Sequence, residues 1–279
     1  MISPFAIVFS IVTVIVALIL PPVFAVAYAL KNRKQGILSA WLLGALGFAV
    51  PQILIRMPVL QLLSANSGFV AFAQSHMILY GLGLAFTAGL FELAGRYAVA
   101  LLLRKRLTCR RALAAGLGHG GIEAMFLIAC MGFLNNLVYM FLISTGRFDA
   151  LVAQVAASGV DVSTLETIPQ VLAATPAGMF LLAGFERLIT MTCHAAMSML
   201  VCYGVRVGRT WRCLLICLGV HTFLDSTACI SMFIGRGLSQ PVAYTIIYAM
   251  LTAVCVVCIL TIRELCRRWP SDALQEEVQ

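Results

Sequence analysis

The sequence predicts an all-α membrane protein with about seven transmembrane helices. Of its 279 residues, 62% are hydrophobic and only 11% are charged, a balance that is typical of polytopic membrane proteins and excludes an ordinary soluble domain. The apolar residues form long runs, and short basic clusters separate these runs. Because such clusters orient membrane helices, the net charge of +8 indicates topology, and no nucleic-acid partner is expected.

Each apolar run is long enough to cross a bilayer as a helix. The first run contains Pro21 and Pro22, which predict a kink. It lacks a basic start and a small-residue cleavage site, so we expect a retained helix rather than a signal peptide. A long connection at 144–175 includes a predicted short surface helix at 148–157. The predicted spans are residues 3–30, 37–60, 75–103, 112–143, 176–205, 213–234 and 241–262.

We expect one transmembrane helical domain over residues 1–270, with a motif-bearing core at about 75–234 and a disordered cytoplasmic tail at 271–279. Of the seventeen Lys and Arg residues counted in connections, fourteen fall on one side, and the other side has only Arg56, Arg147 and Arg236. Basic residues are enriched on the cytoplasmic side of membrane proteins. The N-terminus is therefore predicted outside and the C-terminus in the cytoplasm, in a multi-pass protein of a bacterial inner or plasma membrane.

Four predicted spans carry ionisable residues at a depth where lipid does not solvate them. Three pairs of these residues are spaced by four, so both members of each pair lie on one helix face. Counting from the nearest basic boundary at about 1.5 Å per residue places the whole set roughly 12–20 Å inside the membrane. Unrelated helix contacts would not need a common depth, so we predict one convergent cavity. Its residues are Glu92, Arg96, His119, Glu123, His194, His221 and Asp225.

Two further features receive a minor role. Glu186 and Arg187 share a span with His194, but Glu186 lies deeper, so this pair is expected to support the site rather than act in it. Most of the ten cysteines lie inside apolar runs. They are expected to be packing residues rather than disulfide or zinc ligands.

Two schemes for hydrolysing an amide fit this set of side chains. In one, a glutamate activates water and the histidines stabilise the oxyanion or the leaving group, so that no cofactor is needed. In the other, His119, His194 and His221 hold zinc, and Glu123 acts as the base on its water. The sequence contains neither an HExxH helix nor its inverse. It favours the metal-free scheme, because that scheme also gives the first glutamate–arginine pair a task.

Four segments together resemble a known bacterial family: FELAGR (91–96), GLGHGGIEA (116–124), FERLITMTCH (185–194) and HTFLD (221–225). They resemble the YhfC-type membrane peptidases, which are similar to the CAAX-type and PrsW-type glutamic intramembrane proteases and, more distantly, to a scaffold subunit of gamma-secretase. The resemblance covers about half the chain and implies a membrane-embedded protease. Phe91 stands where the CAAX relatives have a further glutamate, so the residue that activates water is either Glu92 or Glu123.

The expected function is therefore an intramembrane endopeptidase whose substrate is a membrane-embedded or lipidated peptide or protein. No cofactor is favoured, and zinc is the alternative. Two alternative functions, which belong to other classes of protein, would use the same buried charged residues. They are an ion-coupled transporter, which should show an internal repeat of broken helices, and a non-catalytic membrane scaffold, which should tolerate loss of single polar residues.

The charge distribution makes a prediction about topology. A reporter that is active only in the cytoplasm should be active when fused after Gln279, and a fusion near Ser158 should behave as exported, because most basic residues in connections share the side of the C-terminus. The measurement is reporter activity in intact cells. The reverse pattern at either position would refute the predicted orientation and the depths counted from it.

Overall fold

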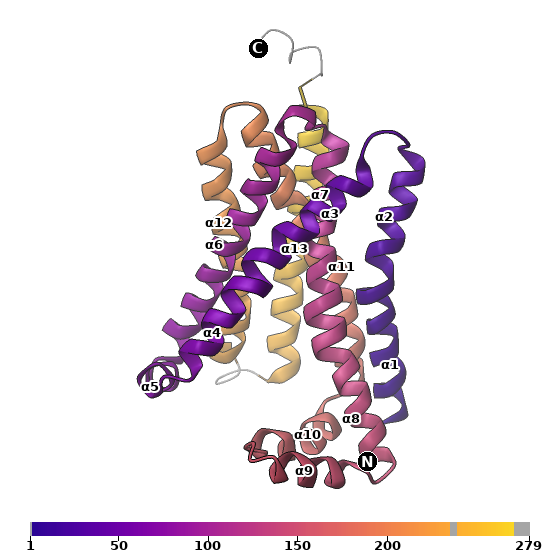
Figure 1. Ribbon diagram of the computed structural model, residues 1–279, viewed down its shortest axis with the longest axis vertical. Helices are drawn as coiled ribbons and strands as arrows, with labels where there is room; N and C mark the ends of the chain where they lie inside the picture. Colours follow the sequence, from indigo (N-terminus) through magenta and orange to yellow (C-terminus); the bar gives the residue numbers. More distant parts are fainter. Residues whose placement is uncertain (1, 235–238, 271–279) are drawn as a thin grey trace. The chain divides into compact units, whose positions relative to one another are not determined.

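The computed structural model describes residues 2–234 and 239–270, and these residues contain helices but no strand (Figure 1). The predicted all-α class is confirmed. The tail predicted at 271–279 lies outside the described residues, as does Arg236, one of the few basic residues assigned to the outer side.

The chain packs as two compact units, and each unit combines segments that are far apart in the sequence. The single domain expected over residues 1–270 stays a prediction. The first unit comprises Met1–Phe24 and Glu123–Leu188, and the second comprises Ala25–Ile122 and Ile189–Gln279.

Within the described residues, six helices are long and apolar enough to cross a membrane. The protein is therefore a multi-pass integral membrane protein. The predicted span at 213–234 is also a helix, 25 residues long, but it is not one of these six, so the number of spans and their orientation remain predictions. The six are Pro4–Lys31, Ile37–Ser64, Met77–Arg106, Cys109–Ser144, Ala177–Arg206 and Val242–Arg267.

The helices divide into the following segments, some of which join end to end. They are α1 (Pro4–Val14), η1 (Ile15–Ile19), α2 (Leu20–Lys31), α3 (Ile37–Phe48), η2 (Ala49–Arg56), α4 (Met57–Ser64), α5 (Ser67–Ser75), α6 (Met77–Leu103), η3 (Arg104–Arg106), α7 (Cys109–Glu123), η4 (Ala124–Phe133), α8 (Leu134–Ser144), α9 (Phe148–Ala157), α10 (Ser163–Ala174), α11 (Ala177–Arg206), α12 (Thr210–Ile234) and α13 (Gln240–Arg267).

Three of the spans contain a stretch of π-helix, namely η1, η2 and η4. Proline inside an α-helix lacks an N–H and collides with the carbonyl group four residues earlier. For Pro21 that carbonyl belongs to Ala17 in η1, and Pro51 itself lies in η2. The wider π turn accommodates such a residue, so the first span continues through its prolines as one helix.

The second unit depends on glycines at helix contacts. An added Cβ atom would lie 1.8 Å from the Ala115 carbonyl oxygen at Gly44, and 1.9 Å from the Trp41 carbonyl oxygen at Gly118. On α6, a Cβ at Gly95 would lie 1.8 Å from the Gly47 carbonyl oxygen. Because lipid supplies no hydrophobic force between helices, such close backbone packing is a main source of stability. It brings α3 against both α6 and α7.

The first unit has its own small core, formed by buried Ala6, Met140, Leu172 and Phe180. The buried Thr13 hydroxyl donates to the Phe180 carbonyl oxygen, which ties α1 to the start of α11. The surface helix predicted at 148–157 is present as α9, and the long connection also contains α10. This connection is therefore mostly helical.

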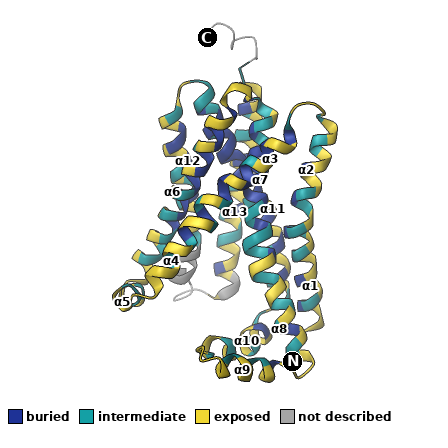
Figure 2. Ribbon diagram, viewed as in Figure 1, coloured by how far each residue is buried: buried dark blue, intermediate teal, exposed yellow. Residues whose placement is uncertain are grey.

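The apolar surface of the spans suits a lipid environment. Large aliphatic and aromatic side chains are exposed along them, shown as yellow stretches in Figure 2. Leu54, Leu102 and Leu215, for example, are each about two-thirds exposed. Hydrocarbon tails solvate such side chains, so their exposure carries no cost in a bilayer.

Two expectations from the sequence were wrong. Arg56, counted in an external connection, is buried in η2, where it donates to the Leu84 carbonyl and the Thr87 hydroxyl. Removing Arg56 from the count of basic residues in connections increases the difference in positive charge between the two sides.

The cysteines are not all packing residues, because Cys109 and Cys266 form a disulfide with their Cα atoms 5.8 Å apart. The fold brings these two residues together although they are 157 positions apart in the sequence, and spacing alone could not show this.

The glycine contacts predict a difference between two substitutions on α6. Gly95→Ala should lower the stability of the purified protein by about 1–3 kcal/mol, because the added Cβ meets the backbone of α3. Gly83→Ala, where nothing lies within 4 Å, should be neutral or slightly stabilising. Thermal unfolding in one detergent measures both. Equal effects would contradict the proposed close packing.

Candidate active site

Four helices of the second unit bring five buried ionisable side chains together. Glycine makes this possible at two of the contacts. A Cβ at Gly120 would lie 2.9 Å from His194 Cβ, and one at Gly89 would lie 3.5 Å from His221 Cβ. Helix α11 therefore approaches α7 closely, and α12 lies beside α6 (Figure 1). The five side chains are Glu92 and Arg96 from α6, His119 from α7, His194 from α11 and His221 from α12.

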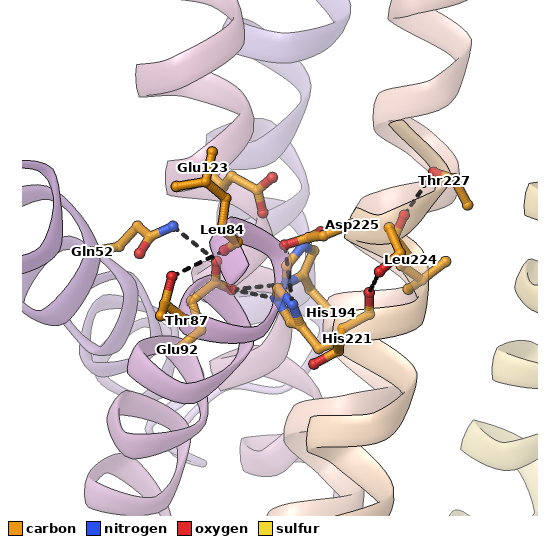
Figure 3. Close-up of polar contacts among 12 residues, drawn as sticks. Gln52, Leu84, Thr87, Glu92, Glu123, His194, His221, Leu224, Asp225 and Thr227 are labelled. Carbon is orange, nitrogen blue, oxygen red and sulfur yellow. Dashed lines mark hydrogen bonds and ion pairs between the residues drawn. The ribbon is translucent and has the colours of Figure 1, made fainter. Parts of the chain in front are cut away.

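The carboxylate of Glu92 is the centre of this group (Figure 3). Its Oε2 atom lies 3.0 Å from His119 Nε2, 2.9 Å from His221 Nε2 and 3.1 Å from Arg96 Nη2. The nearest ring nitrogen of His194 is 3.7 Å away. Glu92 is only 3% exposed, so these contacts replace the water that a carboxylate normally requires.

Two contacts settle the orientation of His194. The Nη2 atom of Arg96 lies 2.6 Å from the Nδ1 atom of His194. The His194 ring also stacks on the His119 ring, with their centroids 5.4 Å apart. A guanidinium group only donates hydrogen bonds. In this arrangement His194 Nδ1 is therefore the acceptor.

His221 is held from both sides of its ring. Its Nδ1 atom lies 3.4 Å from an oxygen of Asp225, one turn along α12, while Nε2 faces Glu92. Both neighbours are carboxylates, and a neutral imidazole has a single N–H, so in that form it donates to only one of them. The Asp225 side chain is 39% exposed, so it lies at the edge of the group.

The sequence reasoning missed one member of the site. Gln52 in η2 is buried, and its Nε2 atom donates to Glu92 Oε1 over 3.4 Å. The available signal was a polar residue next to Pro51 in an apolar run. Its amide supplies a donor for the carboxylate oxygen that the histidines do not contact.

The remaining predicted residues lie in the first unit and form their own ion-pair cluster. Arg187 Nη1 lies 3.5 Å from Glu123 Oε1, and its Nη2 atom pairs with Glu186. Glu123 therefore shares a partner with Glu186, the residue expected only to support the site. Its role in the chemistry stays a prediction, based on its spacing from His119 on α7.

The donor atoms also suit a metal ion. Within the described residues, one group offers ligand atoms within 4.8 Å of one another, and it is Glu92, His194 and His221, all buried. Two imidazoles and a carboxylate are a known catalytic zinc set. Asp225 lies 3.4 Å from the other ring nitrogen of His221, and carboxylates commonly occupy this position beside metal-binding histidines. This set includes Glu92 in place of His119, which the sequence-based zinc scheme had used.

A comparison with protein families identifies the chain. The profile of the family described as YhfC intramembrane metalloprotease matches residues 16–248. The chain belongs to the YhfC family. This confirms the resemblance read from the four motifs, and all the candidate site residues lie inside the matched region. It supports an intramembrane protease, whereas a relationship to the CAAX-type and PrsW-type enzymes remains a prediction.

A curated relative within the YhfC family is similar over most of its length. It is the uncharacterized membrane protein YhfC of Bacillus subtilis (strain 168), which is 31% identical over 210 residues, covering 75% of this chain and 79% of the relative. No solved structure matches.

The central ion pair predicts a strong effect on stability. Glu92→Leu should cost about 3–5 kcal/mol in free energy of unfolding, because Arg96 is then buried without a counter-ion. The double variant Glu92→Leu/Arg96→Leu should recover much of this loss. Denaturant or thermal unfolding in a single detergent measures both variants.

A control for this prediction is the exposed pair of Glu264 and Arg267 on α13. Glu264→Leu should leave the unfolding transition close to that of the unmodified protein, because water solvates the remaining charge. If the double variant at Glu92 and Arg96 were as unstable as Glu92→Leu, the unpaired arginine would not be the cause.

Proposed function

We propose that this chain is an intramembrane endopeptidase that cleaves a peptide bond beside the Glu92 group, with a divalent metal ion held by Glu92, His194 and His221. The observation that carries the proposal is the gathering of these three buried ligand groups within 4.8 Å. The family description, YhfC intramembrane metalloprotease, supports the same assignment. Zinc is the metal that best suits two imidazoles and a carboxylate in a catalytic site.

When bound, such a metal polarises the carbonyl group of the substrate and activates water as a nucleophile. The residues around it have separate tasks. Asp225 orients His221 through Nδ1, and Gln52 donates to the second oxygen of Glu92. His119 contacts Glu92 through Nε2, and a ring nitrogen beside the reacting group is suited to donating a hydrogen bond to an oxyanion.

Arg96 restricts how His194 can bind a metal ion. Its guanidinium lies 2.6 Å from His194 Nδ1, so ligation through Nδ1 replaces this hydrogen bond, and Arg96 then interacts with Glu92 alone. A positive charge here also compensates the carboxylate in the low-dielectric interior of the membrane. Arg96 is therefore assigned to positioning and charge balance.

Glu123 is proposed as the general base that takes a proton from the attacking water. The proposal rests on its position one helical turn from His119 on α7, and a carboxylate is a suitable general base. The assignment is independent of the metal ligands. Mutation separates the two roles.

A metal-free glutamic protease is the second candidate, and one observation favours it. The Glu92 carboxylate already has donors at both oxygens, from Gln52, Arg96 and histidine, so its charge is satisfied by protein groups alone. In this scheme Glu92 or Glu123 activates water, and the histidines donate to the oxyanion. The two candidates differ in their response to a chelator.

Metal content and activity should change differently in two variants. The purified full-length protein should contain about one zinc per chain, and a chelator should stop cleavage of a co-reconstituted membrane peptide until zinc is restored. His221→Ala should lose both metal and cleavage. Glu123→Gln should keep the metal and lose about 100-fold or more in turnover, as expected for a missing general base.

The matched control is Glu166→Gln, which changes an exposed glutamate on α10 and should keep both properties. Elemental analysis and fragment detection by mass spectrometry on the same samples give the answer. Cleavage that persists in metal-free protein would establish the glutamic scheme. Normal turnover by Glu123→Gln would remove that residue from the chemistry.

A further inference from the structure

A second polar site lies at the end of the second unit where the basic connections gather. A cavity of about 740 Å³ opens between the α2–α3 connection, η3 and the start of α7. Five of its nine lining residues are basic, and none is acidic. The basic residues are Lys34, Lys105, Arg106, Arg110 and Arg111.

The positive charge of this cavity has no carboxylate partner among the described residues. The hydrogen bonds of its arginines go to neutral groups, from Arg110 to Gln35 Oε1 and from Arg111 to the Arg106 carbonyl. The Nε atom of Arg111 is buried and has no hydrogen-bond partner within the described part of the chain. Five like charges around one cavity repel one another, and a bound anion relieves that repulsion.

The backbone adds to the attraction for an anion. Helices α3 and α7 both begin at the cavity, and the N-terminus of a helix carries partial positive charge and free N–H groups. Gly36, with φ of 64°, precedes α3 in the left-handed region. A Cβ there would lie 2.3 Å from Arg111 Nη2, so glycine lets this guanidinium lie against the turn.

The location of the cavity indicates the source of the anion. It lies at the ends of two spans whose apolar side chains are exposed within a few residues of its lining, namely Leu38 on α3 and Leu102 on α6. A phosphate group bound here would be attached to acyl chains that can lie along those leucines. Basic pockets at the membrane boundary are a recognised type of lipid headgroup site.

We propose that this cavity binds the phosphate group of an anionic membrane phospholipid. The four exposed basic residues provide access from the headgroup region, and the half-buried Arg111 contributes a guanidinium that can donate to a phosphate oxygen. The site is independent of the proposed peptidase chemistry. Its test therefore needs no substrate.

The test measures lipid binding to the full chain in an uncharged detergent by native mass spectrometry. Phosphatidylglycerol should bind at least about tenfold more tightly than zwitterionic phosphatidylcholine. Lys105→Gln/Arg110→Gln should weaken phosphatidylglycerol binding by about tenfold or more, since each substitution removes a charged donor that lines the cavity and can contact the phosphate group directly. Both side chains are exposed, so folding should survive, and Lys34→Gln/Lys105→Gln provides a second variant of the same kind.

The matched control is Arg33→Gln/Arg104→Gln, which removes the same charge from exposed neighbours that do not line the cavity. It should change affinity by less than about twofold. Equal losses in the cavity and control variants would overturn the proposal, because attraction would then be diffuse. Displacement of phosphatidylglycerol by equimolar inorganic phosphate or pyrophosphate would also overturn it, since the cavity would then take soluble phosphates.

Discussion

The buried carboxylate of Glu92 is the constraint on which the second unit depends. A charge in the interior of a membrane protein is tolerated only when protein groups replace water around it. Here those groups come from several helices, with Arg96 one turn away on α6, His119 from α7, His221 from α12 and Gln52 from η2. Satisfying one carboxylate therefore constrains how these helices pack, and it gathers several polar side chains in one buried place.

Small residues make this convergence possible. Gly89 and Gly120 stand at the contacts that carry the histidines, while Gly44, Gly95 and Gly118 let backbones touch elsewhere in the unit. The π turns next to proline preserve continuous helices through residues that would otherwise break them. Stability and site geometry thus come from the same packing, so substitutions at these glycines affect both.

The molecule uses ionisable groups differently at two depths. Around Glu92, opposite charges and neutral donors compensate one another, as a low dielectric requires. At the basic cavity, like charges gather without acidic partners in the described part of the chain, which is tolerable only near water and lipid headgroups. The first group lies within the region that matches the YhfC family, whereas the second lies where two connections and a helix start meet.

The sequence by itself determined the helical class, the membrane location, the family and most of the Glu92 group. The length of an apolar run predicts a transmembrane span. Helical spacing predicts the helix face on which a residue lies, and its distance from a basic cluster predicts its depth in the membrane. The sequence itself contains a Cys-x-x-Cys pair, Cys255 and Cys258, which lies within the apolar helix α13. Only the tertiary structure decided that Glu92 rather than His119 joins His194 and His221 as a candidate ligand set. It also placed Gln52 in the site and showed that Arg56 is buried. The pairing of Cys109 with Cys266 likewise came from the structure. The reason is physical: periodicity along one helix fixes direction and depth, but the rotation and approach of neighbouring helices depend on packing between residues distant in sequence.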